Sequence, residues 1–166
     1  MNVSELVHQY AEAIAYMDGP DGRYGPDEWL ADEVGRGRLI ATFWYRRTEP
    51  VTRAGVEIAP VVNPHAWPHG VELQWDSVTG WAYAGMVDHY GDDVDFYEPL
   101  RVDKLASPAT ILTQLRLLLD DHNAALPSSS ERWQQPTAAT LAEILCLAPS
   151  APALVGHSND RLKERP

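Results

Sequence analysis

Apolar residues recur every three or four positions near the start of the chain, which predicts an amphipathic helix over residues 3–17. Asn2 is a suitable N-cap, and Glu5 three residues later completes a capping box. The glycine- and proline-containing run 18–22 ends this helix. Pro26 then predicts a short second helix through Trp29 and Val34, ended by a glycine.

Beyond residue 37 the pattern changes to short runs of β-forming residues between turn residues. These runs predict strands over residues 38–47, 56–62, 71–76, 81–87 and 94–100. Pro60 indicates an edge position or a bulge in the second of them. Strands that follow one another closely favour an antiparallel meander.

The stretch ELQWDSVTGWAYAG, residues 72–85, reads as a hairpin in which Gly80 supplies positive φ to the turn. Alternation places Trp75 on one face of its strand, and Trp81 continues that face on the returning strand. The preferred interpretation is a clamp that feeds the core. The alternative is an exposed tryptophan pair that forms a binding platform.

Ser107 and Pro108 open a strongly apolar helix predicted over residues 107–123. Residues 126–136 have the composition of a linker, and 137–148 form a short helix. Residues from 149 onward lack periodicity and are expected to fray. The prediction is therefore one α+β domain over residues 1–125, followed by a linker, short helix and flexible tail over 126–166. Its mainly antiparallel five-stranded sheet and flanking N- and C-terminal helices form a two-layer sandwich.

The motif W-D-x-x-x-G-W, formed by Trp75, Asp76, Gly80 and Trp81, resembles a family of small uncharacterised actinobacterial proteins, a domain of unknown function. In that family an N-terminal helix precedes the hairpin and a C-terminal helix follows it. The resemblance covers residues 1–125, and this chain departs from it in a longer first half and an added C-terminal segment. It implies the fold and carries no activity or catalytic residues.

A net charge of −11 over 166 residues disfavours non-specific binding to nucleic acid and suits a basic protein partner. A single cysteine, Cys146, excludes an internal disulfide, and as part of an apolar helix face it is expected in the core. The N-terminal segment lacks a basic n-region and a cleavage site, and no apolar run is long enough to span a membrane. A cytoplasmic location is expected.

His65 and His69 are four residues apart, a spacing that binds metal when both lie on one helix face. Pro64 and Pro68 argue against a helix there, and a third ligand, such as His89, would have to come from elsewhere. A polar loop with a packed tryptophan is preferred over a metal site.

The segment DHYGDDVDFYE, residues 88–98, carries five acids and no Lys or Arg: Asp88, Asp92, Asp93, Asp95 and Glu98. It does not fit the calcium-loop spacing. A solvated hairpin loop is the simplest interpretation, and a recognition surface for a basic partner or a cation site are alternatives.

No catalytic constellation stands out, because the chain has no phosphate-loop ending, no nucleophile elbow and no paired acid and base. The expected function is a non-enzymatic acidic module that binds another protein, without cofactor, nucleic acid or membrane. Secretion chaperones, immunity proteins and small regulators use comparable acidic α+β domains, which is an analogy of fold. The alternatives are a metal-binding domain or enzyme using the His65 and His69 loop, and an acidic mimic of nucleic acid.

Overall fold

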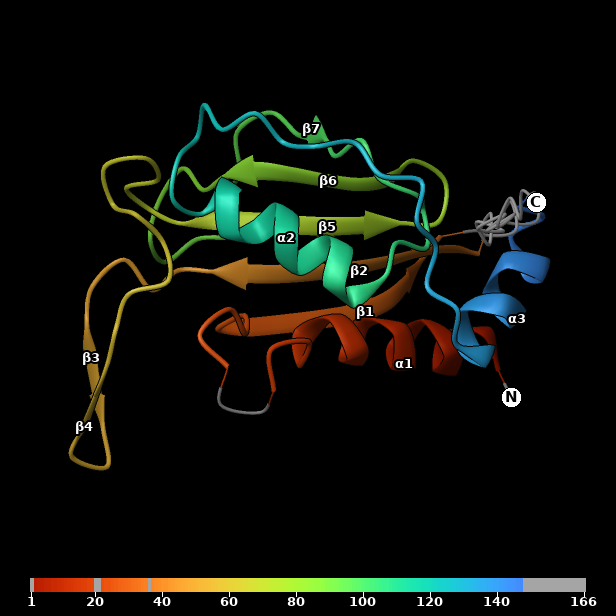
Figure 1. Ribbon diagram of the computed structural model, residues 1–166, viewed down its shortest axis with the longest axis horizontal. Coiled ribbons are helices and arrows are strands. Elements are labelled where there is room, and N and C mark those ends of the chain that lie inside the picture. Colours follow the sequence, from red (N-terminus) through yellow and green to blue (C-terminus); the bar gives the residue numbers. More distant parts are fainter. Residues whose placement is uncertain (1, 20–21, 36, 148–166) are drawn as a thin grey trace, which may run out of the picture.

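The computed structural model describes residues 2–19, 22–35 and 37–147, so the tail predicted to fray lies outside the described residues. The chain forms three helices, a mainly antiparallel five-stranded sheet and a separate two-stranded sheet, an α+β architecture (Figure 1). The elements are α1 (Val3–Ala15), β1 (Glu28–Val34), β2 (Arg38–Tyr45), β3 (Val51–Arg53), β4 (Val56–Ile58), β5 (Val71–Asp76), β6 (Gly80–Gly85), β7 (Glu98–Pro99), α2 (Pro108–Leu118) and α3 (Pro136–Ile144).

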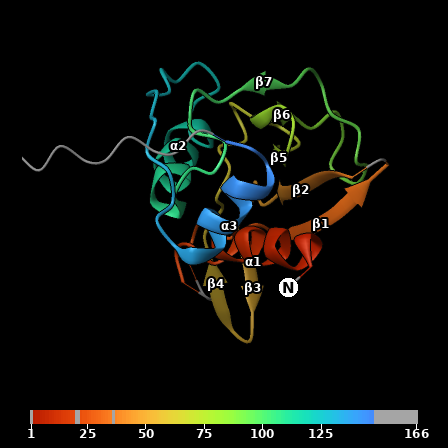
Figure 2. The same ribbon diagram turned by 90° about the vertical axis from the view of Figure 1, so that its right-hand side faces the viewer.

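The large sheet has the strand order β1-β2-β5-β6-β7, and each neighbouring pair is antiparallel. Helices α1 and α2 lie on the same side of this sheet (Figures 1 and 2). We call the side that faces them the helix side and the opposite side the outer side. Alternation along β2 places Phe43 and Tyr45 on the helix side and Trp44 on the outer side.

Aromatic rings fill the core between the sheet and α1. Tyr10 of α1 contacts Trp75 and Trp81 at centroid distances of 5.7 and 6.1 Å, and its hydroxyl donates to the Ala106 carbonyl at 2.8 Å. Phe43 stacks on Trp81 at 6.0 Å. Tyr10 and Phe43 are fully buried. The apolar face predicted for α1 therefore covers this core.

The prediction of a helix at residues 26–34 is wrong, because Glu28–Val34 forms β1. Seven residues of β1 pair with β2, and Trp29 and Ala31 alternate toward the helix side opposite Phe43 and Ala41. Long-range pairing with a buried strand outweighs the local helix-start signal of Pro26.

The predicted strand 56–62 is also corrected. Only Val56–Ile58 is extended, and it pairs with Val51–Arg53 in a hairpin that projects from the body at the left of Figure 1. Its tip residues Ala54 and Gly55 both have positive φ, 49° and 77°, as a two-residue hairpin turn of type I′ requires. The fifth strand of the large sheet is therefore β1 rather than residues 56–62.

Three other predicted elements are shorter in the structure. Strand 94–100 is reduced to Glu98–Pro99 plus an isolated bridge between Met86 and Val94. Helix α2 ends at Leu118 instead of residue 123, and α3 ends at Ile144. Among the helices of the described residues, none is long and apolar enough to cross a membrane.

The predicted linker after residue 125 packs on the rest of the chain. Ser129 exchanges backbone hydrogen bonds with Arg101 and Asp103, and the Trp133 amide donates to the Leu105 carbonyl at 2.8 Å. Leu141 of α3 is fully buried in the same core cluster as α1. Residues 126–147 therefore complete the core instead of merely following it.

Candidate functional site

Trp75 and Trp81 are paired across the β5–β6 hairpin and belong to the core. Their exposed fractions are 0% and 2%. The Trp75 indole Nε1 donates to the Lys104 carbonyl at 2.7 Å, which satisfies its one polar atom. Gly80, with φ of 86°, makes the turn between them. Burial removes both rings from any surface that a partner can reach.

The five acids of the predicted recognition segment are all exposed. They lie in residues 87–98, a loop that leaves β6, turns back and returns to the sheet at β7; we call it the acidic–aromatic segment. Two backbone hydrogen bonds close the first part of this loop. The Val87 amide donates to the Asp93 carbonyl at 3.0 Å, and the Asp95 amide donates to the Gly85 carbonyl at 2.9 Å. Most of the segment is thus a loop held by backbone hydrogen bonds rather than a strand.

Asp88 organises the turn of this segment. Its Oδ1 accepts hydrogen bonds from the backbone amides of Gly91 and Tyr90, and these bonds hold the pKa of its carboxyl below the ordinary value. The Asp88 carboxylate therefore has a structural role in the loop, in the manner of an Asx turn.

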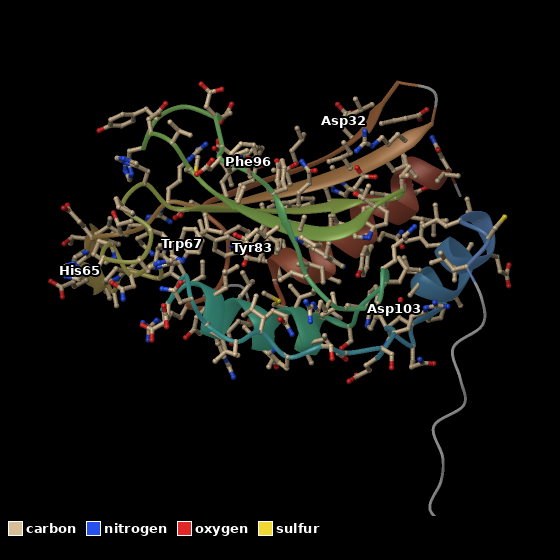
Figure 3. The ribbon with its side chains drawn as sticks, turned by 90° about the horizontal axis from the view of Figure 1, so that it is seen from above. Asp32, His65, Trp67, Tyr83, Phe96 and Asp103 are labelled. Atoms are coloured by element: carbon tan, nitrogen blue, oxygen red, sulfur yellow. The ribbon has the colours of Figure 1, made fainter. Side chains whose placement is uncertain are left out.

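Exposed aromatic side chains lie between the acids. Tyr90 is 94% exposed and Phe96 is 89% exposed, and Figure 3 places Phe96 on the side of the sheet away from α2. The sequence prediction selected the acids of this segment and missed these rings. The available signal was the adjacency of Phe96 and Tyr97, because two neighbouring residues of an extended chain cannot both face the sheet.

Tyr97 fastens the segment to the outer side of the sheet. Its hydroxyl donates to Glu72 Oε1 and accepts from Gln74 Nε2 at 3.1 Å. Trp44 Nε1 donates to Glu72 Oε2 at 2.8 Å. Burial raises the pKa of the Glu72 carboxyl and outweighs the hydrogen bonds from Tyr97 and Trp44, which lower it. Both Glu72 oxygens accept hydrogen bonds, so this carboxyl anchors the segment to β5.

Arg46 makes a second attachment. Its guanidinium donates to Asp92 Oδ1 at 2.8 Å and to Glu28 Oε2 at 2.9 Å, and it lies 5.6 Å from the centre of the Trp44 ring. Asp92 is therefore engaged within the molecule. Asp93 and Asp95 have no such side-chain partner among the described residues, so their charges are available to a partner.

His65 and His69 lie in the exposed loop between β4 and β5, with His65 at the far end of the molecule from α3 (Figure 3). The His65 amide donates a hydrogen bond to Asn63 Oδ1 within the loop. Trp67 Nε1 donates to the Leu118 carbonyl at 2.7 Å and so holds the loop against the end of α2. His89 stacks edge-on against Tyr90. Within residues 2–19, 22–35 and 37–147, no three His, Cys, Asp or Glu side chains are grouped to hold a metal ion.

Cys146 is exposed, which corrects its expected place in the core. It follows the end of α3 with a φ of 53°, so the helix has already stopped before this residue. The apolar face of α3 is carried by Ala138 and Leu141 instead.

No family model, no curated protein and no solved structure matches this chain. The resemblance of the Trp75–Trp81 hairpin to an uncharacterised actinobacterial family therefore stays a prediction.

Proposed function

We propose that this protein is a non-enzymatic module that binds a basic protein partner through the acidic–aromatic segment. The observation that carries the proposal is the near-complete exposure of Tyr90 and Phe96, at 94% and 89%, among exposed carboxylates. Large aromatic side chains that a folded monomer leaves in water are the usual anchors of protein interfaces.

The negative charge of this segment also supports a binding role for it. The net charge is −11, and Asp93 and Asp95 add unpaired negative charge beside Phe96. Carboxylates at the rim of an interface steer a basic partner, while aromatic rings at its centre supply most of the binding free energy. A mimic of nucleic acid would need only the negative charge. The exposed aromatic rings therefore favour a surface that binds another protein.

The segment is also held in place. Tyr97 and Arg46 attach it to Glu72 and Glu28 of the sheet, so less ordering is needed when a partner binds. We infer that the domain beneath it is a two-layer sandwich, since α1 and α2 lie together on the helix side (Figure 2). The outer side then remains for the partner.

The test is affinity purification from the native host with four forms of the full chain. Wild type is compared with Tyr90→Ala/Phe96→Ala, with Asp93→Asn/Asp95→Asn, and with a control, Glu12→Gln/Glu143→Gln, that changes charge equally on exposed positions of α1 and α3. We expect one basic protein to be retained by wild type and control and lost from the other two forms.

Association of that partner should slow as salt rises, because exposed charges are screened beyond a Debye length of about 8 Å at physiological ionic strength. The aromatic variant should bind weakly at every salt concentration. A partner held equally by all four forms, or no protein that distinguishes them, would overturn the proposal.

A further inference from the structure

A second surface, between the β3–β4 hairpin and the body, carries more cationic than acidic side chains among the described residues. Between the projecting hairpin and the body lies an open groove of about 600 Å³, which we call the hairpin groove. Its apolar wall includes Trp29 of β1 and Val56 and Ile58 of β4, and its cationic wall includes Arg47 and Arg53. The combination is unusual for a chain with a net charge of −11.

Arg47 is the buried cation of this groove. Its side chain is 11% exposed, and its Nε is buried without a hydrogen-bond partner. Nη2 donates to the Arg23 carbonyl at 3.1 Å, and Nη1 lies 3.9 Å from Asp27 Oδ1, too far for a hydrogen bond. Among the described residues, one N–H of this guanidinium has an acceptor and Nε is a buried donor without one.

Asp27 is the one acid among the described lining residues, and it offsets part of the charge of Arg23, Arg47 and Arg53. Its Oδ2 already accepts the backbone amides of Arg46 and Arg47, at 2.7 and 3.1 Å. Arg53, on the exposed hairpin, has no side-chain partner among the described residues. A buried donor without an acceptor costs free energy, and an anion that accepted the Arg47 Nε–H would remove that cost.

We propose that the hairpin groove binds a small organic anion, with its carboxylate, sulfonate or phosphate on Arg47 and Arg53 and its apolar body against Trp29, Val56 and Ile58. Guanidinium groups match such oxyanions in geometry and charge. The acidic–aromatic segment is nearby, since Arg47 also lines a hollow with Tyr90. Its acids are exposed and Asp92 is paired with Arg46, so solvent and salt screen their effect on the groove over about 8 Å. The groove has no lining residue in common with the acidic–aromatic segment.

The probe for this test is anilinonaphthalene sulfonate, which joins an aromatic body to a sulfonate, compared with N-phenylnaphthylamine, the same body without the charge. Fluorescence titration of the wild-type protein should show saturable, single-site binding of the sulfonate. Arg53→Gln should weaken it about tenfold, because a hydrogen bond to a charged group supplies roughly one order of magnitude in affinity. Arg101→Gln, an exposed arginine elsewhere, is the matched control and should bind like wild type.

Arg47→Gln should weaken the sulfonate further, and its melting curve shows whether the variant is folded. Arg53 lies on an exposed hairpin, so its variant keeps the test valid if Arg47→Gln unfolds. Binding of the neutral probe should be nearly the same in wild type and Arg53→Gln. Equal affinity of wild type and Arg53→Gln for the sulfonate, or an equal loss for both probes, would overturn the proposal.

Discussion

Glu72 and Asp76 lie on the same side of β5, yet their surroundings shift their pKa values in opposite directions. The contribution of burial alone raises the pKa of each carboxyl. In Asp76 this effect is outweighed by hydrogen bonds from the Arg38 guanidinium and from the amides of Val78 and Thr79. The donors to Glu72 include two neutral aromatic side chains, and burial prevails there. The balance between burial and hydrogen bonding therefore differs between the two carboxyls, and a charged donor acts only on Asp76.

Asp76 gives a prediction with a definite sign. Because its folded-state pKa is lowered from 3.8, its contribution to stability is present above about pH 4 and is lost as pH falls through the folded-state pKa. Asp76→Asn should lower the free energy of unfolding by about 1.5–3 kcal/mol at pH 7, the usual effect of hydrogen bonds to a charged group.

The measurement is urea unfolding of wild type and Asp76→Asn between pH 3 and pH 7. The difference between them should shrink below about pH 4, whereas Asp93→Asn, at an exposed position, should stay close to wild type throughout. A difference that stayed constant down to pH 3 would contradict the ionised role of Asp76.

Among the elements, α3 shows how much the C-terminal part of the described chain contributes. Leu141 is fully buried against the core that α1 covers, and Thr137 of α3 lies 3.2 Å from Gln9 of α1 through their side-chain oxygens. Arg132, just before α3, forms a double hydrogen bond with Asp103 at 3.0 and 3.1 Å. An element attached in this way unfolds with the domain.

Leu141→Ala should therefore reduce the free energy of unfolding by about 2–5 kcal/mol, as for other buried leucines. Unfolding monitored by circular dichroism and by tryptophan fluorescence should remain a single coincident transition. Ala139→Gly, at an exposed site of the same helix, should have an effect of only about 1 kcal/mol. Two separate transitions in wild type would show that α3 folds independently.

Elements with a clear period could be predicted from the sequence. Strand 71–76 and the hairpin turn at Gly80 are confirmed, and the first helix is confirmed to within two residues. Strand β1 could not be predicted, because Pro26 and the spacing of Trp29 and Val34 suit a helix, and only pairing with β2 decides between the two. Short hairpins such as β3–β4 carry too few residues for a period to appear.

Of the two candidate surfaces, one could be predicted from the sequence and the other could not. The exposure of the acids in the acidic–aromatic segment follows from their clustering in one loop sequence. The hairpin groove could not be predicted, since it combines Trp29, Arg47 and Ile58 from three separate parts of the chain. Its cationic character depends on Arg23, Arg47 and Arg53 lining one groove with a single acid, Asp27, among the described residues, which only the folded geometry determines.

Over the whole molecule, charge acts on stability and binding in opposite ways. A net charge of −11 repels itself within a compact domain, and salt screens that repulsion. Raising NaCl from about 10 to 150 mM should therefore increase the melting temperature by about 2–4 °C if roughly 1 kcal/mol is relieved.

Differential scanning fluorimetry checks this expectation. The charge control Glu12→Gln/Glu143→Gln should show a smaller rise, since it has less repulsion to screen. A melting temperature that fell with salt would show that attractive ion pairs, such as those of Arg46, dominate the balance.

The contact between α1 and α3 also affects the biosynthesis of this protein. The side chains of Gln9 and Thr137 meet across a separation of 128 residues. At about 5–20 residues per second, a ribosome needs roughly 6 to 26 s to add the intervening chain. During that interval the apolar face of α1 has emerged without the helix that completes its packing. The nascent chain is then a candidate client for chaperones, and the packing of α1 against α3 waits until residues 136–144 have been synthesised.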